Sequence, residues 1–536
     1  MADKYLLETG VDFLLLEDGV SFLNLEVAPP APPPAVLGPG RYTPLSDFHN
    51  QLNGKAAFNG STWWMENATV AAIDFVPTVT YYVDYVTGDN ADDGLTPATA
   101  FKYLNNACLA AIAGAVPAHI IIIDEIVGYL STAVGSGWTF EDSIKISSGS
   151  PSGRTIIAQI RESYVGTFAW SDNADGTWSS STNQLDHTAC FDNLYQDIYG
   201  GAAPQDAEAS GAACVANPGS FFWDGVSTMM VHMQDGREPD EDWIYCSRAT
   251  SSRPLTFMNK IDGTVILENL TIYNNNQGVA HANLGGRCNT YTGTEPNTTK
   301  LGLKNILAYG ASGRAVEFTD YSIIVMENVV CRYARIDGLN YHSISGVGNG
   351  WYMTAYEDRC VAVDMGWEGW KDQLTRGVSA NGSTVHDNIN IMRVGCEYQR
   401  GYGPMVADIN GCDSWNFGVF SEYPNLSDVT DGTNAAFHTN GVSNDANNPA
   451  RMILIGCDGG DTTTGTETAY MMATPLAEAV QVIEHKFWVG ETPITEYGSQ
   501  VSIMSDADYA LIYVAGLGGG QSGPGMAFGS FGKLGG

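Results

Sequence analysis

The sequence predicts an all-β protein whose main body is a β-solenoid, and three observations lead to this prediction. Short β-prone runs recur through the second half of the chain, each closed by a polar or glycine corner. Some equivalent corners lie one coil apart, as Asn305 and Asn328 do at 23 residues. Glycine is abundant, with 61 residues, whereas charged residues make up only 16% of the 536. A repeat of this length that is built from strands indicates coils that stack to bury an apolar face.

The repeat also places cysteines at similar positions. Its runs begin at Ile266, Leu303, Met326, Tyr356, Met392, Ile409 and Leu454. Three of them contain glycine, cysteine and an acid in succession, at Gly395-Cys396-Glu397, Gly411-Cys412-Asp413 and Gly456-Cys457-Asp458. Because equivalent positions of stacked coils form ladders, we expect these three cysteines in one internal row.

The body of the protein is predicted to open with a strand, a turn and a helix. Residues 81–84 form the strand, the acidic stretch 88–94 forms the turn, and an apolar helix spans roughly 99–114. The turn is not an EF-hand, because Ala91 stands at a ligand position and Ala100 stands where the closing glutamate belongs.

Composition shifts divide the chain into five parts. Residues 1–28 repeat β-prone apolar runs closed by Thr9-Gly10 and Asp18-Gly19, which predicts a short β-hairpin segment. Residues 29–40 are proline-rich and form a stiff linker. We expect a small aromatic-rich neck module over 41–78, the solenoid over 79–515 and a glycine-rich tail over 516–536. The stretch 137–260 resists assignment.

The charge balance excludes several classes of function. The chain carries 25 lysines and arginines against 60 acids, a formal net charge of −35, so it lacks the basic surface that nucleic acids or anionic membranes require. The sequence contains no apolar run long enough to cross a membrane and no secretory signal, so we expect synthesis in a cytoplasm. The ten cysteines show no CxxC pair and no zinc spacing, so we expect no metal and no cofactor.

Three segments carry a resemblance to known families. YYVDYVTGDNADDGLTPATAFKYL, from Tyr81 to Leu104, resembles the entry segment of right-handed parallel β-helix proteins of the pectate-lyase-like class. The stretch 337–417 resembles β-helix proteins encoded by phages, through DGLNYH, NGSTVHD and ADINGCDSWNFG. The LLETG and LLLEDG repeats are similar to the attachment end of phage structural proteins.

These resemblances imply a phage tailspike or tail fibre with a right-handed parallel β-helix body. They imply a homotrimer that is part of the virion, after synthesis in the host cytoplasm. The N-terminal segment would attach to other tail or baseplate proteins, and the body would recognise a bacterial surface polysaccharide. The match covers about a third of the chain.

Acidic residues one coil apart are the candidate catalytic groups. Equivalent side chains on adjacent coils stand about 5 Å apart, and two coils apart about 10 Å, which brackets the separations that glycosidases use. Asp364, Asp387 and Asp408 follow one another at intervals of 23 and 21 residues, and Asp337 lies upstream. His386 is a further candidate, in a setting similar to that of His342.

Aromatic residues in the same coils are the candidate sugar-binding groups, because flat rings stack on pyranose faces. A cation near a uronate would suit a lyase. The candidates for substrate binding are Trp351, Tyr356, Trp367, Trp370, Arg393 and Trp415.

Three functions remain open at this point. The first is a fibre that only binds a bacterial surface glycan. The second is a depolymerase on the same β-helix, either a glycoside hydrolase or a polysaccharide lyase. The third is a bacterial β-helix protein unrelated to phages.

Overall fold

The computed structural model divides the chain into two units, Met1–Val36 and Leu37–Gly536. The residues that it describes are 13–15, 22–24, 39–129, 138–159, 170–181, 190–239, 244–246, 255–259, 262–273, 284–288, 298–311, 313–343, 353–366, 380–410, 412–422, 435–440, 451–460, 469–473, 480–483, 486–487, 501–503 and 510–515.

The first unit contains the predicted hairpin. β1 (Phe13–Leu15) pairs antiparallel with β2 (Phe22–Asn24), and the segment that joins them includes Asp18 and Gly19. The glycine-rich tail over 516–536 lies outside the described residues.

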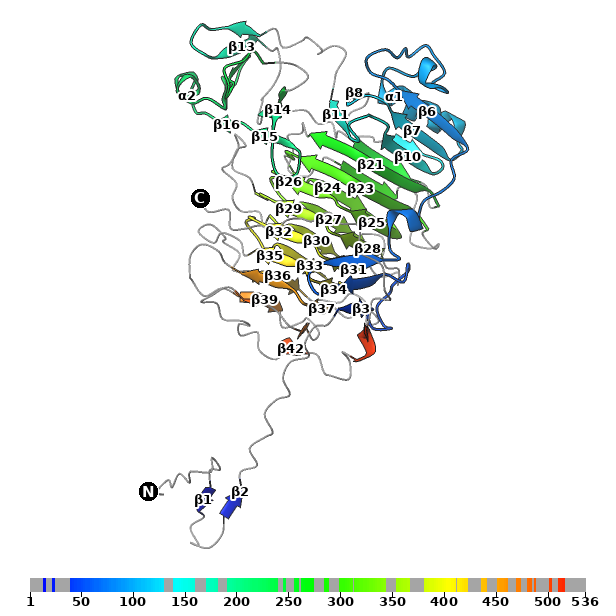
Figure 1. The fold of residues 1–536 in the computed structure, drawn as a ribbon, viewed down its shortest axis with the longest axis vertical. Helices are drawn as coiled ribbons and strands as arrows, with labels where there is room; N and C mark the ends of the chain where they lie inside the picture. The colour runs from blue at the N-terminus through cyan, green and yellow to red at the C-terminus, as the bar shows by residue number, and fades with distance from the viewer. Residues whose placement is uncertain are drawn as a thin grey trace. The chain divides into compact units, whose positions relative to one another are not determined.

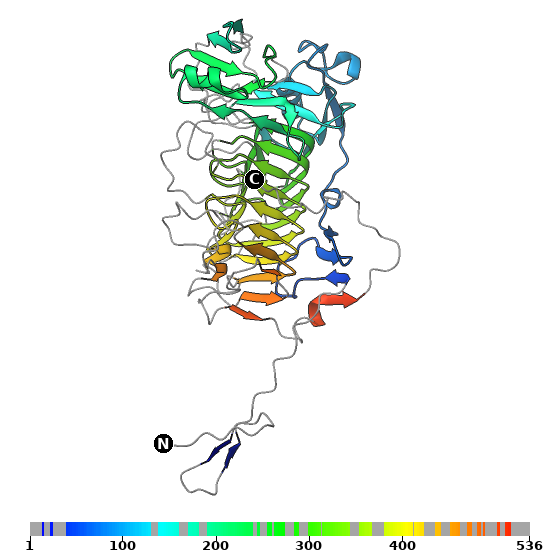
Figure 2. The ribbon, with the colours of Figure 1, turned by 60° about the vertical axis from the view of Figure 1, so that its left-hand side comes forward.

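The second unit is a right-handed parallel β-helix, as the sequence predicts, with three strands to a coil (Figures 1 and 2). From β24 to β38 the strands recur in threes, and each pairs in parallel with the strand three places later in the chain. We number the sheets in the order in which the chain passes through them, and call the turns that follow each sheet the first, second and third corners.

The first sheet stacks β6 (Val79–Val83), β7 (Ala118–Ile122), β10 (Ile144–Ser148), the first halves of β21 (Thr264–Tyr273) and β23 (Lys300–Tyr309), β25 (Ile323–Glu327), β28 (Met353–Asp358), β31 (Ile389–Val394), β34 (Asp413–Phe417), β37 (Arg451–Ile455), β40 (Val480–Ile483) and β42 (Val501–Ile503). The second sheet stacks β8 (Ile126–Tyr129), β11 (Thr155–Gln159), the second halves of β21 and β23, β26 (Val330–Arg332), β29 (Val361–Val363), β32 (Glu397–Gln399), β35 (Phe420–Glu422), β38 (Asp458–Gly460) and β41 (Lys486–Phe487). The third sheet stacks β9 (Trp138–Phe140), β20 (Leu255–Asn259), β22 (Leu284–Cys288), β24 (Val316–Thr319), β27 (Leu339–His342), β30 (Ser383–His386), β33 (Val406–Ile409), β36 (Ala435–Asn440) and β39 (Ala469–Ala473).

From β21 to β38 the first corner turns on a single residue with positive φ in each coil. Asn269, Asn305 and Asn328 hold it in three coils, with φ between 53° and 58°. Their side chains form a ladder, in which Asn305 donates to Asn269 at 2.8 Å and Asn328 donates to Asn305 at 3.1 Å. Asparagine and glycine tolerate this backbone conformation best, so the spacing of Asn305 and Asn328 in the sequence identified one true coil.

The cysteine row was only partly as predicted. Cys396 and Cys457 do share the first corner, with Val419 between them, as the backbone bonds from Phe420 to Cys396 and from Asp458 to Val419 show. Cys412 instead lies at the third corner, where Arg451 donates its N–H to the Cys412 carbonyl. The expectation of one row for all three was wrong, because the Gly-Cys-acid pattern occurs at two different corners.

A short helix closes the start of the solenoid. α1 (Leu104–Gly114) follows the 3₁₀ turn Pro97–Thr99, which Thr96 caps, so the predicted helix begins a few residues later than expected. Leu104, Cys108 and Ala111 are buried against the core that includes β6 and β7. The described part of the chain contains no helix long and apolar enough to cross a membrane.

An insertion between β11 and β20 accounts for most of the stretch 137–260 that the sequence left unassigned, and the rest of the described stretch belongs to the solenoid. The insertion contains β12 (Ser171–Asp172), β13 (Trp178–Ser181), β14 (Cys190–Gln196), β15 (Ala202–Pro204), β16 (Asp206–Ala207), α2 (Gly211–Ala216), β17 (Ser220–Trp223), β18 (Thr228–His232) and β19 (Ile244–Cys246), in two small sheets. Phe191 and Ala202 of this insertion pack on the outer face of the second sheet, against Tyr273 and Tyr309.

The segment 39–75 lies along the outer face of the first sheet, and we call it the strap. Its strands β3 (Gly40–Tyr42), β4 (Lys55–Phe58) and β5 (Trp63–Glu66) form an antiparallel sheet with β43 (Tyr513–Ala515). Figure 1 shows these blue strands beside β31 and β34, with the red C-terminal strand next to β3. The predicted neck module over 41–78 is therefore part of the same compact unit as the solenoid.

Candidate functional site

The outer face of the third sheet carries a row of polar side chains. Side chains alternate between inside and outside along a strand, and Phe318, Tyr341 and Val385 point inward because they belong to the main core. Their neighbours Glu317, Asn340 and Thr384 therefore face outward, and the strand register aligns these three in adjacent coils. We call this row, together with His342, His386 and the adjoining corner residues Arg314 and Asp337, the third-sheet face.

Three oxygens of this row have no hydrogen-bond partner among the described residues. They are Glu317 Oε2, Asn340 Oδ1 and Thr384 Oγ1, and all three atoms are buried. Asn340 is wholly buried and Thr384 is 1% exposed. A buried polar atom without a partner costs about 1–3 kcal/mol. The row is therefore expected to gain stability when a hydrogen-bonding group reaches it.

Asp337 organises one edge of the face, where the second corner leads into β27. Its Oδ1 accepts from the Asn381 backbone at 3.1 Å, and its Oδ2 accepts from Asn340 Nδ2 at 2.9 Å. Arg314 donates to both Glu317, at 3.0 Å, and Asp337, at 3.4 Å. Burial raises the pKa of Asp337, although Arg314 and the hydrogen bonds act against that rise. With this many donors, Asp337 holds its neighbours in position.

The two histidines lie side by side on the same face. His342 and His386 occupy equivalent positions in β27 and β30, and their rings stack with centroids 4.5 Å apart. Burial and the Arg314 charge lower the pKa of His342 to about 4. Burial, His342 and Arg314 lower the pKa of His386 to about 3. Both rings are therefore neutral near pH 7.

Asp387 lies at the third corner, directly after β30. It is half-buried, has φ of 70° and contacts Asn410 of the next coil, whose Nδ2 is 3.5 Å from its Oδ1. Burial raises the pKa of Asp387, and Asp320 raises it further. The third sheet and its two edges therefore hold three of the five predicted catalytic candidates, namely Asp337, His386 and Asp387.

Asp364 lies apart from these groups, at the second corner beside the outer face of the second sheet. It forms ion pairs with Arg332 and with Arg400, the latter at 2.6 Å. Arg332 also pairs with Asp197 of the insertion at 2.5 Å. Burial alone would raise the pKa of Asp364, but Arg400 and Arg332 outweigh it and lower the pKa. A carboxylate held in this way cannot act as a general acid, and it serves to fasten the insertion to the solenoid.

Asp408 and Arg393 lie inside the solenoid. Both side chains are wholly buried, and Arg393 Nη2 donates to Asp408 Oδ1 at 2.9 Å. Arg393 also donates to Ser383 at 2.9 Å and lies 3.9 Å from Glu357. We expected both residues on the outer wall of the solenoid. This expectation was wrong, because the register of β31 and β33 turns both side chains inward.

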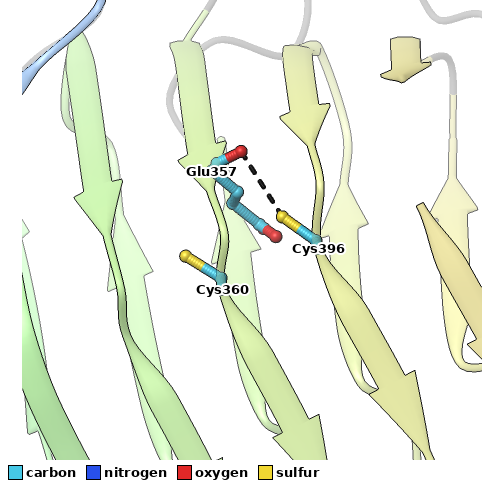
Figure 3. A group of neighbouring side chains, drawn as sticks. All are labelled: Glu357, Cys360 and Cys396. Atoms are coloured by element: carbon cyan, nitrogen blue, oxygen red, sulfur yellow. Dashed lines mark hydrogen bonds between the residues drawn. The ribbon is translucent and has the colours of Figure 1, made fainter. Parts of the chain in front are cut away.

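Glu357 completes this interior network and is shown in Figure 3 with two cysteines. Its carboxylate accepts hydrogen bonds from Tyr341, at 2.8 Å, from Ser383, at 2.8 Å, and from Tyr398. One carboxylate oxygen and the thiols of Cys360 and Cys396 all lie within 4.8 Å of one another. Burial raises the pKa of Cys360 far above that of a free thiol, and the carboxylate is already saturated by donors. The group therefore does not suit a metal ion.

The aromatic candidates for sugar binding fall into two sets. Tyr356 and Trp415 lie on the outer face of the first sheet, but the strap covers both completely. The Tyr356 hydroxyl donates to Asn50 at 2.9 Å, and Phe48 lies edge-on to Trp415. Neither ring is open to a sugar. Trp351, Trp367 and Trp370 lie outside the described residues.

The premise that placed the acids one coil apart fails for a geometric reason. Asp408 is the register partner of Val385 and Thr439, and Asp364 and Asp387 stand at different corners. Coils vary in length because insertions interrupt them. A spacing of 20–23 residues therefore does not show that two residues hold equivalent positions in adjacent coils.

Sequence reasoning missed Glu317, Asn340, Thr384 and Arg314. One signal was visible in the sequence. Asn340-Tyr341-His342 and Thr384-Val385-His386 each consist of a polar residue, an apolar or aromatic residue and a histidine. Glu317-Phe318-Thr319 is the register equivalent in the preceding coil, where a threonine stands in place of the histidine.

No protein-family model matches the chain, and no curated protein is significantly similar to it. Solved structures with a similar chain path include XylC in complex with xylose, at 10% identity and a TM-score of 0.29, with 76% of this chain and 70% of that chain covered. The A-module of mannuronan C-5 epimerase AlgE4 of Azotobacter vinelandii aligns at 10% identity and a TM-score of 0.27, over 74% and 94% of the two chains. GH136 lacto-N-biosidase from Eubacterium ramulus aligns at 10% identity and a TM-score of 0.27, over 76% and 67%. The class of this protein, a parallel β-helix, rests on its own strand topology.

Proposed function

We propose that this protein binds a bacterial surface polysaccharide through the third-sheet face, as the tailspike or tail fibre of a phage. The observation that carries the binding site is the aligned row of Glu317, Asn340 and Thr384, whose buried oxygens lack partners in the described part of the chain. Saccharide hydroxyls are suitable partners, because each can donate to one oxygen and accept from another group. A rigid solenoid holds the row at about 4.8 Å per coil, a fixed spacing along which an extended chain can lie.

The phage assignment has separate support in the sequence. The resemblance of residues 1–28 to attachment segments, the hairpin β1–β2 and the proline-rich linker together favour a virion protein held at its N-terminus. The proposal includes a homotrimer and a tail or baseplate partner. Light scattering of the intact chain tests the trimer, and a monomer would contradict it.

A binding experiment tests the site. The purified chain is applied to an array of bacterial capsule and lipopolysaccharide glycans, and bound members are titrated by calorimetry. Thr384→Val removes one hydroxyl at nearly constant volume and is expected to weaken binding about tenfold, the loss of about one buried hydrogen bond. Thr271→Val is the matched control, because Thr271 is also buried in a strand but lies in the second-sheet half of β21. Equal affinities of the two variants would contradict the proposed site.

A second function, cleavage of the same glycan, has one observation in its favour. Burial and Asp320 raise the pKa of the half-buried Asp387, which is the direction that favours a general acid, and Asp320 holds the same corner two coils earlier, about 10 Å away. Incubation with a bound glycan tests this function through new reducing ends or an unsaturated uronate. If product forms and Asp387→Asn abolishes it while binding persists, the protein is a depolymerase.

A further inference from the structure

The third-sheet face offers mainly acceptors to a ligand. Asn340 Nδ2 donates to Asp337, which leaves the buried Oδ1 as an acceptor without a partner. Glu317 Oε1 is occupied by Arg314, which leaves Oε2 as a second acceptor. Thr384 Oγ1 is the third free oxygen and can both accept and donate. A ligand that completes this row must therefore bring hydroxyl or amide donors.

The charges around the row do not favour an anion. The described residues of β24, β27 and β30 and of their adjoining corners include two arginines, Arg314 and Arg335, against five carboxylates, which are Glu317, Asp320, Asp337, Asp364 and Asp387. Arg314 is shared between two of these carboxylates. His342 and His386 add no charge near pH 7, because burial keeps both rings neutral.

The charge of the whole chain acts in the same direction. A formal net charge of −35 creates a negative potential that repels polyanions at a distance. A carboxylated polysaccharide would have to overcome this repulsion and then find a cation that is not already paired. A neutral polysaccharide meets neither obstacle.

We propose that the third-sheet face selects neutral, hydroxyl-rich saccharide chains and rejects chains that bear carboxylate, phosphate or sulfate groups. This inference rests on the proposed function and specifies its ligand class. Recognition then depends on hydroxyl donors that meet Glu317 and Asn340, and affinity changes little with ionic strength.

The sign of one substitution separates the two ligand classes. Glu317→Gln keeps the shape of the side chain and removes its charge. For a neutral saccharide the loss of a charge-assisted hydrogen bond weakens binding about tenfold. For an anionic saccharide the same change removes a repulsive charge and strengthens binding. Glu208→Gln is the matched control, because Glu208 lies in the insertion, where its carboxylate accepts from Asn217 at 2.7 Å.

The experiment uses the intact chain on an array that contains both neutral and anionic bacterial glycans, at low and at high salt. The expected result is that bound members lack anionic groups, bind alike at both salt concentrations and lose affinity with Glu317→Gln but not with Glu208→Gln. Binding confined to anionic members, weakened by salt and strengthened by Glu317→Gln, would overturn the ligand class and leave glycan binding intact. No binding to any member would instead contradict the proposed function. Circular dichroism of each variant confirms that it is folded.

Discussion

Asn328 occupies a backbone conformation that most residues avoid, and its side chain links two coils. Its φ is 53°, and its amide donates to Asn305 Oδ1 at 3.1 Å. Asn328→Ala is expected to lower the free energy of unfolding by about 2 kcal/mol, since it combines left-handed strain with a lost hydrogen bond. Asn328→Gly should cost less, because it removes the strain, as Gly395, Gly418 and Gly456 do at the same corner. Chemical denaturation measures both, and equal losses would contradict the role of backbone strain.

Arg393 neutralises two carboxylates in the interior. Arg393→Met would leave Glu357 and Asp408 buried without a cation, and it is expected to cost about 3–5 kcal/mol. Arg400→Met is the control, since that side chain is 43% exposed in its pair with Asp364 and should cost under about 1 kcal/mol. Unfolding rates in denaturant measure both. A similar effect of the two substitutions would show that the burial of the Arg393 network adds little to the stability of the fold.

Single residues were predictable where the backbone demands a particular residue type and not where the register decides. Asn305 and Asn328 are 23 residues apart and are true equivalents, but Gly418 and Gly456, also equivalents, are 38 apart. Without the lengths of the insertions, a sequence cannot tell that Asp408 and Arg393 turn inward. For the same reason it could not show that Glu317, Asn340 and Thr384 form one row.

The strap depends on close approach between two elements. An added Cβ at Gly418 would lie 2.0 Å from the Trp63 ring, whereas one at Gly153 would meet nothing within 4 Å. Both glycines have positive φ, so the backbone strain of an alanine is similar at the two sites. Gly418→Ala is therefore expected to displace β5 and to speed proteolysis and hydrogen exchange of residues 55–66, and Gly153→Ala is not. Equal protection in the two variants would contradict the packing of the strap on the first sheet.

The strap also explains why the aromatic candidates were misinterpreted. Tyr356 and Trp415 stand on the outer face of a solenoid, where exposed rings indicate a ligand site. The residues that cover them come from more than 300 positions earlier in the chain, as Asn50 does for Tyr356. Strands, turns and the capping helix follow from local pattern, but a long-range cover of this kind leaves no local signal. The aromatic residues Phe48 and Trp63 showed only that the segment 41–78 needed a partner.

At the scale of the whole molecule, the repeat and the entry segment were sufficient to predict the architecture. Stacked coils bury one continuous core from Val83 to Cys457, so each coil depends on its neighbours and none is a separate domain. The insertion and the strap then cover parts of the second and first sheets. The third sheet carries the aligned polar row of Glu317, Asn340 and Thr384, and the proposed ligand site lies there.

The stacked histidines make the stability of the whole fold depend on pH. His342 and His386 have pKa values of about 4 and about 3 in the folded protein, against about 6.5 in an unfolded chain. Below pH 6.5 the unfolded chain binds protons that the folded protein does not, so stability is complete above pH 6.5 and falls as the pH drops toward 3. Asp413 acts in the opposite direction, because burial raises its pKa to about 6 in the folded state and its contribution is lost as the pH rises through that value.

Replacement of both histidines by glutamine isolates their share, since Asp413 is unchanged. The measured quantity is the unfolding rate of the double variant divided by that of the natural sequence. This ratio is expected to be lower at pH 4.5 than at pH 7.5. If the ratio of the two unfolding rates is the same at both pH values, the histidines do not control acid stability.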